Sequence, residues 1–180
     1  MRSVVFRTIF LICICLLAIR IASAQDSFTI QEPRIIGTGK ISSVVFSPNG
    51  REIAVGTSIG VEILAPNTLQ QIDLIEITDG KSESIAYSPD SKKLVISAGK
   101  RLLISNRATG KVALIKNAQN VNAVQVSPDG QIHALLHNGS VQTWTPNLQT
   151  STTLTGHRFR VKTMAFSLNG RGRATGGADQ

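Results

Sequence analysis

The sequence has little of the chemistry on which enzymes and metal sites depend. Its 180 residues include two cysteines, three histidines and 11 acidic residues. Both cysteines, Cys13 and Cys15, lie in the first 24 residues, so a chain without this segment has no thiol and no disulfide. The carboxylates are scattered, and no pair has a spacing typical of catalysis or metal binding. The sequence therefore predicts a protein that is not an enzyme and has no cofactor or metal.

The N-terminal apolar run, "IFLICICLLAI" at 9–19, is too short to cross a membrane as a helix, and Arg20 interrupts it. It follows a basic start, and "ASA" at 22–24 has the small-x-small pattern of a signal-peptidase site. We expect residues 1–24 to be a signal peptide cleaved near Ala24, which gives a secreted or periplasmic protein without a membrane span. The alternative is a membrane anchor formed by the uncleaved segment.

The net charge is moderate once the N-terminal segment is set aside. The formal charge is +8, from 19 basic and 11 acidic residues. Without Arg2, Arg7 and Arg20 the chain has 16 basic and 11 acidic residues, a formal charge of +5. This balance favours acidic partners only mildly. We expect an exported chain of this kind to bind no nucleic acid.

A short phrase occurs four times along the chain, as "FSPNG", "YSPDS", "VSPDG" and "FSLNG". The serines of the four copies are Ser47, Ser88, Ser127 and Ser167, which lie 41, 39 and 40 residues apart. So regular a period is typical of a stacked array of small structural units.

Each phrase has the composition of a type I turn between two β-rich runs. Proline occupies the second position at Pro48, Pro89 and Pro128, and glycine the fourth at Gly50, Gly130 and Gly170. Two further β-rich runs complete each unit, so that four strands fit in about 40 residues. The sequence predicts an all-β chain: a β-propeller of four-stranded antiparallel blades over residues 25–180. About four repeats begin near residues 41, 82, 121 and 161, with the last incomplete.

Three further motifs support a family resemblance: "TGH" at 155–157, "VQTW" ending at Trp144, and "ATGGAD" at 174–179. With the turns, they resemble the WD-repeat (Trp-Asp repeat) family over Phe28 to Gln180. In that family a histidine, a serine or threonine, an aspartate and a tryptophan form a hydrogen-bonded network. The resemblance assigns the first three places in the fourth copy to His157, Thr175 and Asp179, and the tryptophan position in the third copy to Trp144.

The copies diverge from the family pattern. Gly37, Thr78 and Asn117 occupy the histidine position in the first three copies, and Leu64 and Ser105 the tryptophan position in the first two. A tryptophan of the fourth copy would fall near position 184, and about seven blades are usual in such a family. We therefore expect the chain to be the N-terminal part of a longer propeller, or to need missing blades or self-association to complete one.

Two motifs favour structural roles. His133 and His137 flank three residues of a predicted strand, so they lie about 13 Å apart, too far for one metal ion. "NGS" at Asn138 is a glycosylation sequon, but Asn-Gly is also a preferred tight turn, which we favour.

A basic cluster offers a second surface: Arg158, Arg160, Lys162, Arg171 and Arg173. Alternation along a strand predicts that the first three share one face, which is either a solvated rim or a site for an acidic partner.

The family resemblance implies a non-catalytic protein whose loops bind an unknown protein partner, and the expected signal peptide implies that it is exported. Two alternatives remain. One is a ligand-binding or enzymatic propeller of the TolB-like or lactonase-like kind, and the other is an inactive fragment of a disrupted gene.

Overall fold

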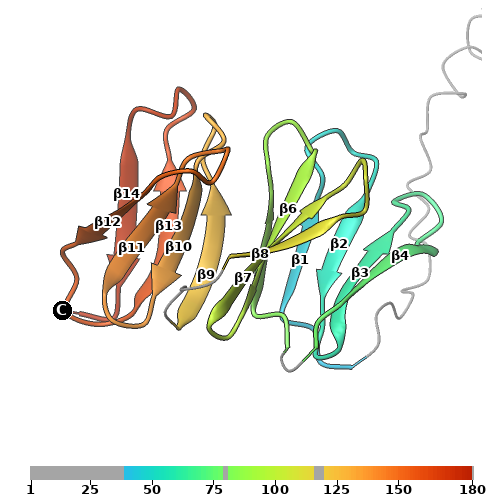
Figure 1. The fold of residues 1–180 in the computed structure, drawn as a ribbon, viewed down its shortest axis with the longest axis horizontal. Helices are drawn as coiled ribbons and strands as arrows, with labels where there is room; N and C mark the ends of the chain where they lie inside the picture. The colour runs from blue at the N-terminus through green and yellow to red at the C-terminus, as the bar shows by residue number, and fades with distance from the viewer. Residues whose placement is uncertain (1–38, 79–80, 116–119, 180) are drawn as a thin grey trace, which may run out of the picture. The chain divides into compact units, whose positions relative to one another are not determined.

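A computed structural model describes residues 39–78, 81–115 and 120–179. The chain divides into two units, Met1–Ile35 and Ile36–Gln180, and all the described strands belong to the second. The expected signal peptide, residues 1–24, lies outside the described residues and stays a prediction. Within the described part, the regular structure consists of strands (Figure 1).

Successive strands pair antiparallel in chain order. The first sheet contains β1 (Ser43–Phe46), β2 (Ile53–Gly56), β3 (Gly60–Leu64) and β4 (Gln71–Glu76). The second contains β5 (Ser84–Tyr87), β6 (Lys93–Ala98), β7 (Arg101–Asn106) and β8 (Val112–Ile115). The third contains β9 (Val121–Val126), β10 (Ile132–Leu136), β11 (Ser140–Trp144) and β12 (Ser151–Thr155). The fourth contains β13 (Val161–Phe166) and β14 (Arg173–Gly177).

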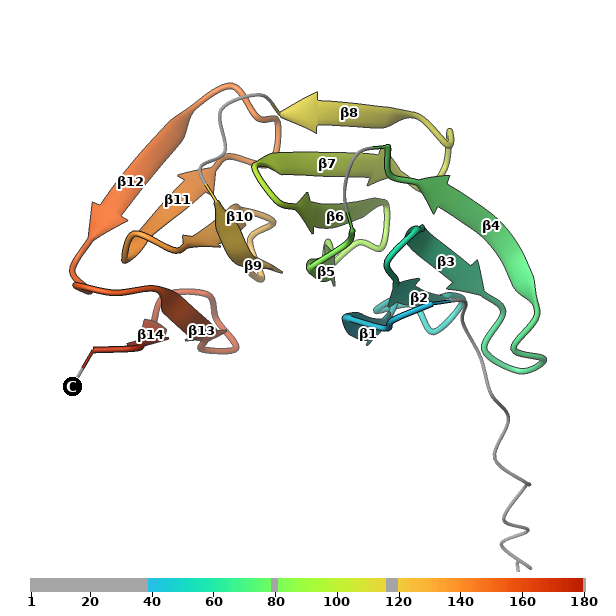
Figure 2. The same cartoon turned by 90° about the horizontal axis from the view of Figure 1, so that it is seen from below.

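This architecture confirms the predicted fold class, four-stranded antiparallel sheets with a fourth repeat of which two strands are described. The first strands β1, β5, β9 and β13 contact one another in succession. Figure 2 shows these strands on the same side of the stack, with β4, β8 and β12 on the opposite side. We call the end of the stack where the first strands begin the start rim, and the opposite end the turn rim.

The repeated phrase forms the turn between the first two strands of each sheet, as predicted. In the first copy the Gly50 amide donates to the Ser47 carbonyl at 2.8 Å, and the other three copies repeat this bond. The Ser47 hydroxyl donates to Asn49 Oδ1 at 2.8 Å and accepts from the Glu52 amide at 2.9 Å. The fourth residue has a positive φ in every copy, which favours glycine. Ser91 holds this position in the second copy, with φ 60°.

Neighbouring sheets bury shared hydrophobic cores between their faces. The first and second sheets share a core of Ala54, Val61, Ile63, Ile75, Ile77, Ile85, Tyr87, Leu94, Ile96 and Ala98. The second and third share Val95, Leu102, Ile104, Val121, Val124, Ile132, Ala134, Leu136 and Trp144. The third and fourth share Leu135, Val141, Val161 and Met164. Each sheet alone is too small to bury its faces, so stacking supplies the core.

The stacking explains why the second strands are almost continuously apolar. In β6, Leu94 and Ile96 belong to the core with the first sheet, whereas Val95 between them belongs to the core with the third sheet. Side chains of a strand alternate between its two faces, so a strand covered on both faces needs apolar residues at every position.

Candidate interaction surface

The fourth repeat contains a polar network around His157, which precedes β13. His157 Nδ1 lies 2.8 Å from Asp179 Oδ1, and His157 Nε2 lies 2.9 Å from Thr175 Oγ1. Because a carboxylate only accepts hydrogen bonds, Nδ1 donates to Asp179, and in the neutral ring Nε2 accepts from the Thr175 hydroxyl. The structure thus brings together the three residues that the family resemblance assigned to the fourth copy.

Asp179 fixes the loop that leads into β13. The backbone amide of Arg158 donates to Asp179 Oδ2 at 3.4 Å, in addition to the contact with His157. Desolvation raises the pKa of Asp179, but hydrogen bonds from backbone amides and from His157 outweigh it, so the pKa lies below its ordinary value. Gly177 leaves room for this network, because a Cβ there would lie 2.0 Å from Asp179 Oδ1.

Trp144 does not join this network. It lies in β11 of the third sheet, is buried, and packs in the core shared by the second and third sheets. The family resemblance assigned Trp144 to the tryptophan position of the third copy, not to the fourth copy, and in the structure it is a core residue of the third sheet.

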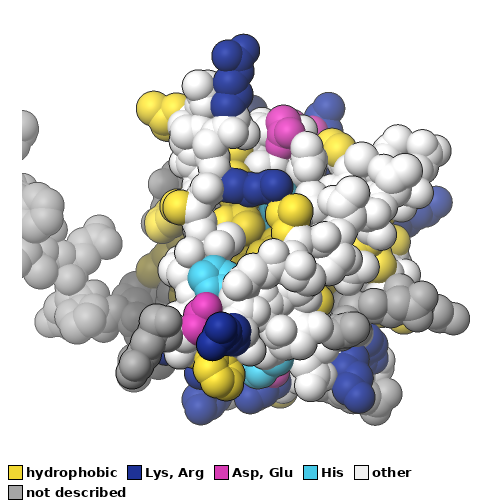
Figure 3. All heavy atoms as spheres, turned by 90° about the vertical axis from the view of Figure 1, so that its left-hand side faces the viewer, with side chains coloured by type: hydrophobic (Ala, Val, Ile, Leu, Met, Phe, Trp, Pro, Cys, Tyr) yellow, Lys and Arg dark blue, Asp and Glu magenta, His cyan; other side chains and the backbone are white. Residues whose placement is uncertain are grey.

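The basic cluster is divided between the two rims. β13 begins at Val161, so Arg158 and Arg160 lie in the preceding loop, and the predicted alternation of three cations along one strand is wrong. Arg171 lies in the turn at the other end of β13, and Arg173 begins β14. Figure 3, viewed from the side of β12 and β14, shows basic side chains spread over this face with exposed hydrophobic ones between them.

His133 and His137 occupy different environments. His133 is buried in β10, where Nδ1 lies 2.9 Å from Thr143 Oγ1 and the ring lies against Phe166. Burial, together with the charge of Arg173, lowers the pKa of His133 to about 4. His137 is exposed in the turn after β10. Among the described residues no group of three or more His, Cys, Asp or Glu side chains could hold a metal ion.

The Asn-Gly dipeptide at Asn138 forms the predicted tight turn between β10 and β11. The Asn138 side chain accepts from the Ser140 amide at 3.1 Å, and Gly139 has φ 86°. A Cβ on Gly139 would lie 2.2 Å from the carbonyl oxygen of His157, so this turn packs directly on the loop of the polar network.

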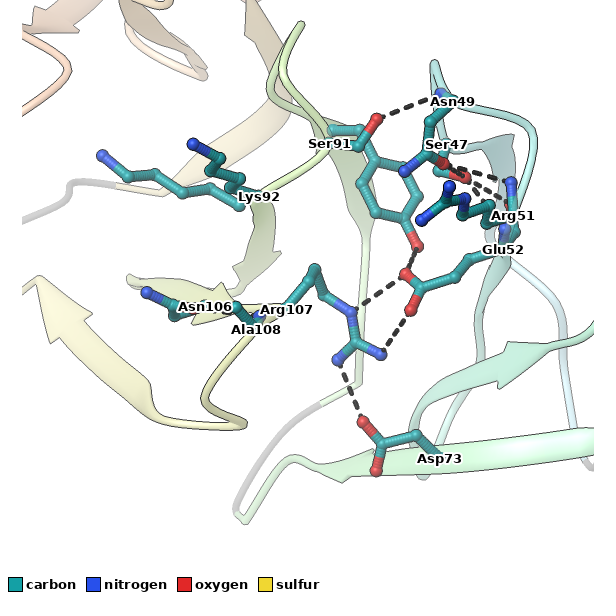
Figure 4. Close-up of polar contacts among 12 residues, drawn as sticks. Ser47, Asn49, Arg51, Glu52, Asp73, Ser91, Lys92, Asn106, Arg107 and Ala108 are labelled. Atoms are coloured by element: carbon teal, nitrogen blue, oxygen red, sulfur yellow. Dashed lines mark hydrogen bonds and ion pairs between the residues drawn. The ribbon is translucent and has the colours of Figure 1, made fainter.

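A charged cluster joins the first two sheets at the turn rim (Figure 4). Arg107 lies between two carboxylates: its Nε and Nη2 donate to Glu52 at 3.0 and 3.1 Å, and its Nη1 donates to Asp73 at 2.9 Å. The Tyr87 hydroxyl donates to Glu52 at 2.9 Å. The Arg107 side chain is only 8% exposed, so the ion pair is largely shielded from water.

This cluster, which sequence reasoning missed, raises the pKa of both Tyr87 and Arg107, for different reasons. Burial and the Glu52 carboxylate raise the pKa of the Tyr87 phenol. Burial alone would lower the pKa of Arg107, but its bonds to Glu52 and Asp73 raise it. Glu52 lies two residues after the phrase that ends at Gly50, and Arg107 directly follows β7, 55 residues after Glu52. The sequence gives no signal that these two positions meet.

The start rim contains a cavity of about 360 Å³ beside the first strands. Its lining comes from all four repeats and includes three cations, Lys40, Lys81 and Arg160.

The described part of the chain contains no helix with the length and hydrophobicity of a membrane span.

Comparison with known proteins places this fold in a class. Residues 148–180 match the family model described as WD domain, G-beta repeat. No curated protein sequence matches the chain. Hydrazine synthase of Kuenenia stuttgartiensis is similar in structure, with a TM-score of 0.68, 13% identity and coverage of 79% of this chain and 43% of that chain. The RRP9 WD40 repeats and U3-55K are each similar with a TM-score of 0.65, 18% identity and coverage of 73% and 44%.

The described sheets are therefore blades of a β-propeller, the class of fold that the 40-residue period predicted. The chain carries a WD40 repeat at 148–180, and its blades have the WD40 fold, which confirms the resemblance drawn from the turns and the "TGH" and "ATGGAD" motifs. The chain spans less than half the length of each of these three structures.

Proposed function

We propose that this protein is a non-catalytic scaffold that binds another protein through the loops of its blades. The observation that carries the proposal is that every pair of adjacent blades shares both a core and a polar tie. The Asn49 amide donates to Ser91 Oγ, the Val124 amide to Ser84 Oγ, and Asn122 Nδ2 to the Val161 carbonyl. Blades joined in this way hold their connecting loops in fixed positions. A partner can therefore bind these loops without a large loss of conformational entropy.

A structural role for the His157 network supports the non-catalytic assignment. A hydroxyl, an imidazole and a carboxylate in contact also describe a nucleophile with its base. Here, however, the carboxylate of Asp179 holds the Arg158 amide, and Thr175 pairs with Met164 inside a sheet. Hydrazine synthase is an enzyme by its name, but a likeness at 13% identity concerns the fold alone.

Photo-crosslinking from chosen positions tests the scaffold. A photoreactive residue replaces Ile59, exposed in the turn between β2 and β3 at the start rim, or Leu114, exposed on the outer strand β8. In the native host we expect one discrete crosslinked protein from position 59 and none from position 114. The same adducts from both positions, or none from either, would contradict binding through the rim loops.

We also propose that a further blade covers the outer face of the first sheet, so that the chain is part of a larger or completed propeller. Val44 and Phe46 of β1 are 50% and 64% exposed on the face opposite the second sheet. They pair with Val55 and Ile53, which belong to an apolar cluster with Leu64. An apolar sheet face of this kind is what the next blade covers elsewhere in the stack.

Export through the N-terminal segment completes the proposal. Its support is the sequence of a basic start, a short apolar run and "ASA" at 22–24. The intact mass of the protein recovered from the host should correspond to a chain that begins at Gln25. Replacement of Leu16 by Arg, in the middle of the apolar run, should leave the full-length mass. A full-length mass for the unmodified protein would favour the anchor instead.

A further inference from the structure

The three cations of the start-rim cavity occupy equivalent positions in the repeat. The residues seven positions before the phrase serines are Lys40, Lys81, Asn120 and Arg160. Equivalent positions of stacked blades lie at the same height on the same rim. Three of the four repeats thus place a cation beside the start of the first strand, and these three cations line one cavity of about 360 Å³.

The floor of the cavity is polar and offers hydrogen-bonding groups. Ser42, Ser58, Ser82 and Asn122 line it together with His137. Ser82 is buried, and its hydroxyl makes no hydrogen bond within the described structure. Gly56 leaves the space for these hydroxyls, because a Cβ there would lie 2.7 Å from Ser82 Oγ and 3.0 Å from Ser42 Oγ.

The charge of the cavity is positive and is not neutralised by ion pairs. Lys40, Lys81 and Arg160 are exposed, and none of them belongs to an ion pair formed among the described residues. Glu83 is the one carboxylate among the described residues of the lining. Cations that converge on a concave surface raise the local concentration of anionic ligands and speed their association.

We propose that this cavity binds an acidic peptide segment of the partner protein. The inference rests on the proposed function and adds the chemistry of the partner. The cations come from three separate blades, which suits carboxylates spaced along an extended chain, and the hydroxyls and the Asn122 amide can bind a peptide backbone. A compact phosphate group would favour several arginines converging on one point, whereas the described lining contains one.

Fluorescence anisotropy with a labelled peptide of six glutamates tests the proposal on the processed chain. The pocket variant carries Lys40→Gln, Lys81→Gln and Arg160→Gln. The control carries Arg51→Gln, Lys92→Gln and Lys111→Gln, three exposed cations outside the cavity with the same charge change. We expect the pocket variant to bind at least about tenfold more weakly and the control within about twofold of the unmodified protein. Thermal melts should show both variants folded.

The proposal would be overturned by no binding to the unmodified protein, by equal weakening in both variants, or by equal binding of a six-glutamine peptide. Displacement of the peptide by 10 mM inorganic phosphate would instead identify a site for a small oxyanion. Tighter binding of a single-stranded oligonucleotide of equal charge would identify a nucleic-acid site. The Ile59 crosslink tests the scaffold function independently of the cavity. A crosslink that persists in the pocket variant would contradict the acidic-peptide proposal but not the scaffold function.

Discussion

Arg107 and Glu52 form a two-point ion pair between the first two blades, from positions 55 residues apart. The guanidinium contacts Glu52 with two nitrogens, and both side chains are mostly shielded from water. Removing one member of such a pair leaves the other charge buried without its partner, which costs more than the pair itself contributes. At the scale of single residues, the attachment of the first blade to the second therefore depends on Arg107.

Replacing Arg107 by Met should lower the free energy of unfolding by about 2–3 kcal/mol, because the largely shielded Glu52 carboxylate, and with it Asp73, loses its cationic partner. The change is measured by urea denaturation at pH 7. Arg51→Met is the matched control, since Arg51 is exposed and adjacent to Glu52, and should change stability by less than about 0.5 kcal/mol. Equal losses in the two variants would show that the contact contributes nothing specific.

His133 should make stability depend on pH below neutrality. Its pKa is about 4 in the folded protein and 6.5 ordinarily. Between these pH values the unfolded chain binds a proton at His133 and the folded chain does not. The free energy of unfolding should therefore fall as the pH drops from about 6.5 to about 4, by at most about 3 kcal/mol from this group. Arg173 adds to the effect and Asp129 opposes it.

His133→Gln removes the titrating group, so the slope of stability against pH between 6.5 and 4 should be smaller in this variant. His137→Gln, at an exposed position, controls for the loss of a histidine. If His133→Gln kept the slope of the unmodified protein, another group would be responsible.

Turns and loops connect the strands of every repeat. Their glycines differ in how much an added side chain would destabilise the protein. Gly130 has φ 82°, but a Cβ there would only touch Pro146 at 3.5 Å. Gly139 has φ 86°, and a Cβ would lie 2.2 Å from a backbone oxygen. Gly156 has no positive φ, and a Cβ there would meet no heavy atom within 4 Å. The destabilisation caused by a positive φ can therefore be measured separately from that caused by a steric clash.

Alanine at these glycines should give a graded series. Gly139→Ala should cost more than about 2 kcal/mol, because the two backbones must move apart, and Gly130→Ala about 1 kcal/mol from its positive φ alone. Gly156→Ala should be nearly neutral. Midpoints of thermal unfolding give the order, and a loss for Gly130→Ala as large as that for Gly139→Ala would contradict the role of the close approach.

The whole molecule is an array in which each blade needs a neighbour. The outer face of the first blade keeps Val44 and Phe46 exposed, whereas the equivalent faces of the second and third blades are covered. An exposed apolar sheet face favours association. At this scale, the oligomeric state reports whether a further blade covers this face.

The processed chain, residues 25–180, should elute in size-exclusion chromatography as an assembly larger than one copy. Phe46→Asp should shift it toward the monomer, because a charge on this face opposes packing. Leu168→Asp, at a fully exposed turn position, should leave the elution unchanged. A monomer with a cooperative melt would argue against the need for a further blade.

Sequence alone determined the repeating unit of this protein. The phrase serines fixed the period, and the apolar runs beside them fixed the strands, because turn geometry and strand alternation are local properties that a few neighbouring residues encode. The grouping of His157, Thr175 and Asp179 came from the resemblance of the "TGH" and "ATGGAD" motifs to the WD-repeat family, not from local geometry.

Only the tertiary structure decided which distant residues meet. Stacking brings Glu52 to Arg107 and places Lys40, Lys81 and Arg160 around one cavity. It also buries Trp144 in the core shared by the second and third sheets. Such contacts depend on how the blades pack on one another, and the spacing of residues within a single repeat does not encode that packing.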